Sequence, residues 1–121
     1  MIRSLSTLAL ATGVCLSLAI PAAAQDKAKA EKGAALFSSQ QCVMCHSVGT
    51  KGNKKGPLDE VATKLKAEEI REWLINPDAM REKTKATRTP AMKQLHLSKD
   101  QVDALVAFLE VQKASTGNAQ K

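Results

Sequence analysis

Residues 42–46 read Cys42-Val43-Met44-Cys45-His46, and the rest of the chain can be interpreted from this stretch. On a helical turn, positions three and four apart lie on the same face. The two thiols can therefore reach one flat ligand from the same side, and the next imidazole can be held over it. Cys-x-x-Cys-His is the attachment pattern of c-type haem. We predict one haem c, bound covalently through Cys42 and Cys45, with His46 as the proximal iron ligand.

Three other interpretations of this stretch are weaker. A thioredoxin-like redox pair requires a strand before the first cysteine, and no strand pattern precedes Cys42. A tetrahedral zinc site could use Cys42, Cys45, His46 and His96. However, adjacent Cys and His ligands suit one metal poorly, and His96 has no partner at zinc-site spacing. A structural disulfide between Cys42 and Cys45 would leave His46 without a role.

The first 24 residues have the parts of a secretory signal peptide. Arg3 provides the positive end, residues 5–20 are apolar, and Pro-Ala-Ala-Ala at 21–24 supplies a small-residue cleavage site. The apolar stretch is short and contains Ser, Thr and Gly, which favours a cleaved leader over a retained membrane anchor. We therefore expect removal of 1–24, no stable membrane insertion, and a periplasmic protein made of residues 25–121.

The predicted mature chain is one small domain with little core material. Removal of 24 from 121 residues leaves 97, and the whole chain has one Trp, two Phe and no Tyr. Domains of this size need an additional source of stability besides the hydrophobic core, such as a metal, a disulfide or a cofactor. A buried haem would supply a large apolar surface for short helices to pack against. We therefore expect the chain to fold poorly without haem.

The sequence predicts helices both before and after the haem motif. Residues 27–37 form an amphipathic pattern in which Gly33 and Phe37 share the apolar face. A glycine inside a helix costs about 1 kcal/mol relative to alanine, so Gly33 is a candidate crossing point for another helix. Residues 58–75 read as two short helices that end at Asn-Pro. Within them we expect Trp73 to pack against the haem.

The clearest predicted helix is the last one. Ser98-Lys99-Asp100-Gln101 has the Ser-x-x-Gln form of a capping box. The apolar stripe that follows consists of Val102, Leu105, Val106 and Leu109, with Phe108 at its edge. The stretch 78–93 before it is polar and basic, and 115–121 reads as a polar tail.

After the haem motif, a loop over 47–57 ends in Gly56-Pro57, with Leu58 next. With the motif before it and a Met-containing loop and a capped helix after it, the chain resembles class I cytochromes c of the small, soluble, bacterial monohaem type. The resemblance implies an all-α cytochrome c fold, with about four to five short helices around one haem. It also implies that the Pro57 carbonyl accepts the ring N–H of His46, and that Leu58 packs on the haem. Leu58 is one residue nearer to the proline than is usual in the family.

The resemblance further implies that the terminal helices cross. The crossing is expected between Gly33 and Phe37 on one helix and Leu105 and Phe108 on the other.

The sixth ligand of the iron has three candidates, Met80, Met92 and His96. Met44 lies inside the haem motif and is excluded by geometry. Met80 follows His46 by 34 residues, which a loop and two helices already occupy. Met92 follows His46 by 46 residues, which resembles the spacing in short bacterial cytochromes c. We predict Met92 as the ligand, although the common Met-Pro pair of the family is Met-Lys here.

Two protein ligands leave the iron no open position, which favours electron transfer over catalysis. We therefore expect an electron carrier between respiratory or dehydrogenase partners, and not an enzyme. One alternative is a haem subunit bound permanently to a dehydrogenase or an oxidase. Another is a haem peroxidase or gas sensor, against which Met92 and the lack of a recognisable distal acid–base set both argue.

Charge predicts the kind of partner. The leader contains one basic and no acidic residue, so its removal lowers the formal charge from +6 to +5. The basic residues near the expected haem edge are Lys51, Lys54, Lys55, Lys83, Lys85, Arg88 and Lys93. Such a ring would attract an acidic redox protein, while a plain solvated surface is the alternative. Nucleic-acid binding is not expected, because export and the absence of a stacking platform argue against it. We expect a monomer.

Overall fold

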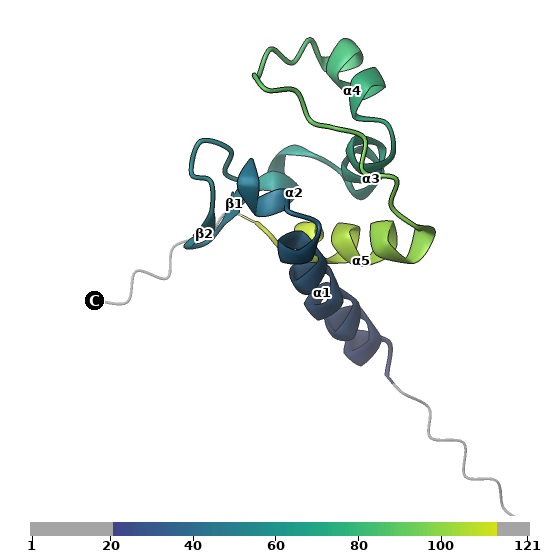
Figure 1. Cartoon of the computed structure of the whole chain (residues 1–121). Helices are drawn as coiled ribbons and strands as arrows, with labels where there is room; N and C mark the ends of the chain where they lie inside the picture. Colours follow the sequence, from purple (N-terminus) through teal and green to yellow (C-terminus); the bar gives the residue numbers. More distant parts are fainter. Residues whose placement is uncertain (1–20, 114–121) are drawn as a thin grey trace, which may run out of the picture.

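A computed structural model describes residues 21–113 of the chain. The elements are α1 (Ala22–Ser39), the short 3-10 turn η1 (Cys42–Met44), strands β1 (Ser47–Val48) and β2 (Lys51–Gly52), α2 (Val61–Lys64), α3 (Ala67–Ile75), α4 (Pro77–Thr84) and α5 (Lys99–Glu110). Helices α1 and α5 cross, and α3 and α4 lie to one side of them (Figure 1). The predicted all-α class is confirmed, with two antiparallel strands of two residues each inside the predicted 47–57 loop.

Helix α1 begins earlier than the sequence predicted. The expected start was residue 27, whereas the helix starts at Ala22. The added residues are mainly alanines, which have the highest intrinsic helix propensity. The predicted cleavage after Ala24 falls inside this helix and stays a prediction. Residues 1–20 of the expected leader and the polar tail at 115–121 lie outside the described residues.

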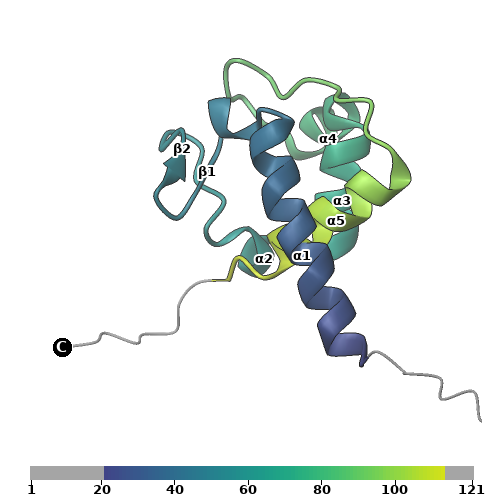
Figure 2. The ribbon, with the colours of Figure 1, turned by 60° about the horizontal axis from the view of Figure 1, so that its bottom comes forward.

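The terminal helices cross at the residues that the sequence singled out. A β-carbon added to Gly33 would meet the Ala104 carbonyl oxygen and lie 2.6 Å from the Phe108 β-carbon. Beside this contact, the rings of Phe37 and Phe108 lie 5.6 Å apart at an interplanar angle of 53°, a favourable tilted pair. Glycine is therefore required at position 33, because any side chain would push the two backbones apart. Figure 2 shows α1 lying across α5.

Helix α5 has the predicted capping box and the predicted buried stripe. The Ser98 hydroxyl accepts from the Gln101 backbone N–H at 3.3 Å, and the Gln101 side chain accepts from the Ser98 N–H at 2.9 Å. Leu105, at the centre of the stripe, is fully buried. A 2.6 Å ion pair between Arg71 and Asp103 joins α3 to α5 at their exposed side. The stripe residues, all buried, are Val102, Leu105, Val106 and Leu109.

Helix α4 was not predicted, because 78–93 read only as a polar, basic stretch. Its start signals are nevertheless present in the sequence. The Asn76 side chain accepts from the Ala79 N–H at 3.2 Å, and Pro77 occupies the first turn, where its missing N–H costs nothing. Only Pro77 and Met80 are buried on this helix, so no apolar stripe marked it.

The segment 85–97 has no helix or strand. It carries the chain from α4 back to α5 and arches over the molecule (Figure 2). Because it contains Met92 and three of the predicted basic residues, its path decides which side chains meet the haem motif.

Candidate haem-binding site

The side chains of the haem motif and of the 85–97 segment line one cavity of about 460 Å³. This volume is within the range of small-molecule and cofactor sites. Its lining includes Cys42, Cys45, His46 and Met92, the residues predicted to hold the haem and its iron. The apolar part of the lining includes Phe37, Leu58, Val61, Leu65, Ile70, Trp73, Leu74, Leu95, Leu105 and Leu109. The cavity is therefore an apolar chamber with potential iron ligands in its wall.

The haem motif is a tight turn that follows α1. Gln41 adopts the left-handed conformation, with φ 59°, and turns the chain out of the helix. The Cys42 carbonyl then accepts from the backbone N–H of Cys45 at 3.1 Å and of His46 at 2.8 Å. Cys42 is half-buried and Cys45 is exposed. Burial is the main cause that raises the pKa of the Cys42 thiol.

The geometry does not favour the three weaker interpretations of the motif. Both cysteines are free thiols and not a disulfide. Helix α1, and not a strand, leads into Cys42. Within residues 21–113, no three His, Cys, Asp or Glu side chains are grouped so that they could hold a metal ion. His96, the fourth ligand of the zinc interpretation, is exposed and does not line the cavity.

The His46 imidazole is oriented by a backbone carbonyl, as the resemblance implied, but the residue differs. Its Nδ1 lies 3.2 Å from the Gly56 carbonyl oxygen, so Nδ1–H donates and Nε2 is left for a metal. The expectation that Pro57 supplies this carbonyl is corrected. The Gly56 oxygen also accepts from the Ser47 N–H at 3.0 Å, which turns it toward the motif, while Pro57 is exposed.

The surroundings of His46 favour the neutral, metal-binding form of the ring. Burial is the largest cause that holds the pKa of His46 below its usual value. The hydrogen bond to Gly56 acts in the opposite direction, and the charge of Arg88 lowers the pKa further. Imidazole binds metal only when the coordinating nitrogen carries no proton, so the site is prepared for a metal at neutral pH.

The three candidates for the second axial ligand lie in different places. Met92 is half-buried and lines the cavity. Met80 is 5% exposed in α4 and does not line the cavity, and neither does His96. Met44 touches the cavity from inside the motif, but its side chain is 68% exposed. The structure thus brings Met92 together with the motif, and its role as a ligand stays a prediction.

One contact of Arg88 was not predicted from the sequence, in which Arg88 was only one residue of a basic surface. The Arg88 guanidinium donates to the Cys45 carbonyl, and one of its nitrogens lies 3.5 Å from Nδ1 of His46. The partners are more than 40 positions apart in the chain, and no local pattern marks such a pair. Trp73, by contrast, lines the cavity as expected.

Comparison with known proteins agrees with this geometry. The sequence model of the family described as Cytochrome c matches residues 30–113. This span covers more than half of the chain, and the protein belongs to the cytochrome c family. No curated protein and no solved structure matches the chain. Among the described helices, none has the length and apolar character needed to cross a bilayer.

Family membership assigns the cofactor and the general activity. Cytochromes c bind haem c covalently through cysteines, and Cys42 and Cys45 have the required spacing. The residues present fit this group, because Cys42, Cys45 and His46 line one largely apolar cavity of about 460 Å³ and the contact with Gly56 leaves Nε2 of His46 free. When bound, the haem supplies a one-electron couple, and the family indicates haem-based electron transfer.

Proposed function

We propose that the protein is a periplasmic electron carrier whose haem iron is held by His46 and Met92. The observation that carries the proposal is the shared cavity, which Met92 lines with the motif while Met80 and His96 do not. A neutral thioether opposite an imidazole raises the reduction potential and leaves no position for a substrate. Electron transfer between larger redox complexes is the activity that such a site supports.

The fold supports this activity by holding the His46 ring rigidly and by giving the haem cavity an apolar lining. The Gly56 carbonyl holds the His46 ring in one orientation. The apolar lining from α3 and α5, which includes the buried Ile70 and Leu105, makes this part of the cavity unfavourable for water. Because little has to move when the charge of the site changes, the energy needed for reorganisation stays small.

The test is a redox titration of the haem-loaded protein together with exposure to carbon monoxide. We expect a reversible couple that fits one electron, and an optical spectrum of the reduced protein that carbon monoxide leaves unchanged. Rapid binding of carbon monoxide to the reduced protein, or turnover of peroxide, would favour a sensor or a peroxidase instead.

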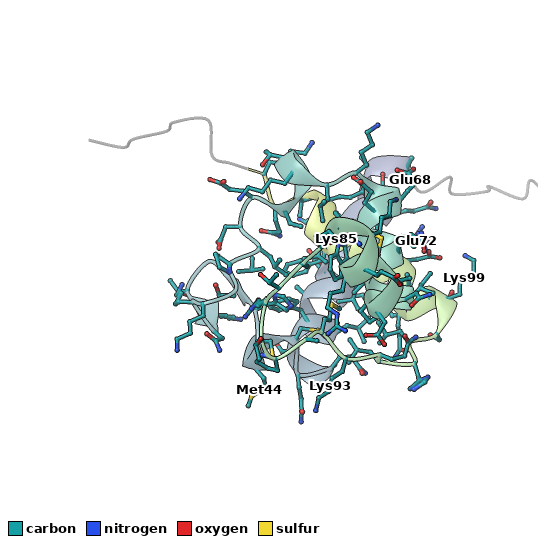
Figure 3. All side chains as sticks on the ribbon, turned by 90° about the horizontal axis from the view of Figure 1, so that it is seen from above. Met44, Glu68, Glu72, Lys85, Lys93 and Lys99 are labelled. Carbon is teal, nitrogen blue, oxygen red and sulfur yellow. The ribbon has the colours of Figure 1, made fainter. Side chains whose placement is uncertain are left out.

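We also propose an acidic redox protein as the partner of a monomeric carrier. Three cationic side chains, Arg81, Arg88 and Lys93, line the cavity and are exposed. Met44, with a 68% exposed side chain, projects from the same edge of the molecule as Lys93 (Figure 3). An apolar contact flanked by positive charge suits a transient interface that electrostatic attraction brings together.

Electron transfer to an anion should therefore depend on salt. The probe is ferricyanide, which carries negative charge and oxidises the reduced protein in a stopped-flow experiment. We expect the rate to fall several-fold between about 0.01 M and about 1 M ionic strength, where the Debye length shrinks from about 30 Å to about 3 Å. A cationic cobalt(III) complex should show the opposite trend.

The matched variants for this experiment are Lys93→Gln and Lys29→Gln. Both remove one exposed positive charge, but Lys29 lies in α1 and does not line the cavity. Lys93→Gln should reduce the salt dependence more than Lys29→Gln. Equal effects of the two variants, or a rate that salt leaves unchanged, would contradict a basic docking edge.

A further inference from the structure

Among the cations of the 85–97 segment, Arg88 contacts the haem motif through its guanidinium. One nitrogen donates to the Cys45 carbonyl, and the other lies 3.5 Å from His46 Nδ1. Because Nδ1–H already donates to Gly56, this second approach is a contact of charge with the ring and not a hydrogen bond. The bond to Cys45 keeps the charge at this place.

Gly56 lies directly against this contact. A β-carbon on Gly56 would collide with both terminal nitrogens of Arg88 and with the Cys45 carbonyl oxygen. The backbone of Gly56 does not adopt the left-handed conformation that favours glycine, unlike Gly49 and Gly52. The need for glycine here therefore comes from the space that the guanidinium and the motif occupy. The residue that orients His46 also makes room for Arg88.

We propose that Arg88 is a positioning residue that holds a permanent positive charge beside the proximal imidazole and thereby raises the reduction potential of the site. The reduced site carries one positive charge less than the oxidised site. A fixed cation nearby consequently favours the reduced form, and the effect grows as the distance between the two charges falls. An Arg keeps this charge at every physiological pH.

This inference rests on the proposed His46-ligated electron-transfer site, and the experiment separates the two. The midpoint potential of the haem-loaded protein is measured by spectroelectrochemistry for the wild type, Arg88→Gln, Arg88→Lys and Lys83→Gln. Lys83 is an exposed cation of α4 that does not line the cavity, so it controls for loss of net charge. A wild type without a reversible one-electron couple would overturn the proposed function itself.

Arg88→Gln should lower the equilibrium constant for reduction about tenfold, which is about 59 mV for one electron. Arg88→Lys keeps the charge and should recover most of this loss. Lys83→Gln should change the constant by less than about twofold, because Lys83 does not line the cavity and the interaction between charges weakens with distance. The inference is overturned if Arg88→Gln matches Lys83→Gln, or if Arg88→Lys loses as much as Arg88→Gln.

A second variant keeps the test decisive if Arg88→Gln does not retain haem. Arg88→Met removes the charge but keeps an unbranched side chain at this position. It should lower the equilibrium constant for reduction in the same direction as Arg88→Gln. An unchanged potential in an Arg88→Met protein that keeps its haem would overturn the inference.

Discussion

The double substitution Cys42→Ala and Cys45→Ala is expected to give a chain without covalent haem that no longer unfolds cooperatively. The two thiols lie in the wall of the central cavity, and much of the core faces it. Loss of the haem would leave an apolar cavity of about 460 Å³ unfilled. Unfilled cavity volume in a core costs about 24 cal/mol per Å³, and a small domain has only about 5–15 kcal/mol of total stability. An empty cavity of this size is therefore enough to unfold the protein.

The measurement is thermal unfolding followed by circular dichroism, together with the haem content of the exported protein. Ser39→Ala is the matched control, because Ser39 is exposed at the end of α1, just before the motif, and does not line the cavity. It should keep both the haem and a cooperative transition. If the double variant melts cooperatively near the temperature of the wild type, the helices pack without the cofactor and the core is more self-sufficient than we infer.

Met92→Ala should have the largest effect on the iron itself. We expect loss of the weak sulfur-to-iron band at the red edge of the oxidised spectrum, a lower reduction potential and binding of carbon monoxide by the reduced protein. The reason is that Met92 is the candidate that lines the cavity together with the haem motif, so its removal opens the second axial position. The measurement is the optical spectrum of the oxidised, reduced and carbon monoxide-treated protein.

The Met80→Ala variant tests whether Met80 is an iron ligand or only a buried packing residue. Met80 is 5% exposed, so its truncation should cost about 2–5 kcal/mol of stability. Its spectrum and its reaction with carbon monoxide should nevertheless match the wild type, because Met80 does not line the cavity. His96→Ala should change neither stability nor spectrum strongly. Loss of the band in the Met80 or the His96 variant, with retention in Met92→Ala, would reassign the ligand.

Several features of the fold were readable from the sequence because they depend on local spacing. The haem motif places two thiols and an imidazole on one turn. The Ser98 capping box and the apolar stripe of α5 follow from hydrogen bonds and periodicity within one helix. Gly33 was recognisable as a crossing point, because a glycine inside an amphipathic helix costs stability unless a second backbone comes close.

Other features depend on the tertiary structure and could not be predicted from local sequence patterns. The sequence could not show that Gly56, and not Pro57, turns its carbonyl to His46. It also did not show that α4 forms and keeps Met80 outside the cavity while the following segment carries Met92 into it. The contact of Arg88 with Cys45 spans 43 positions. Such contacts depend on the path of loops between helices, and helical periodicity within a segment contains no information about that path.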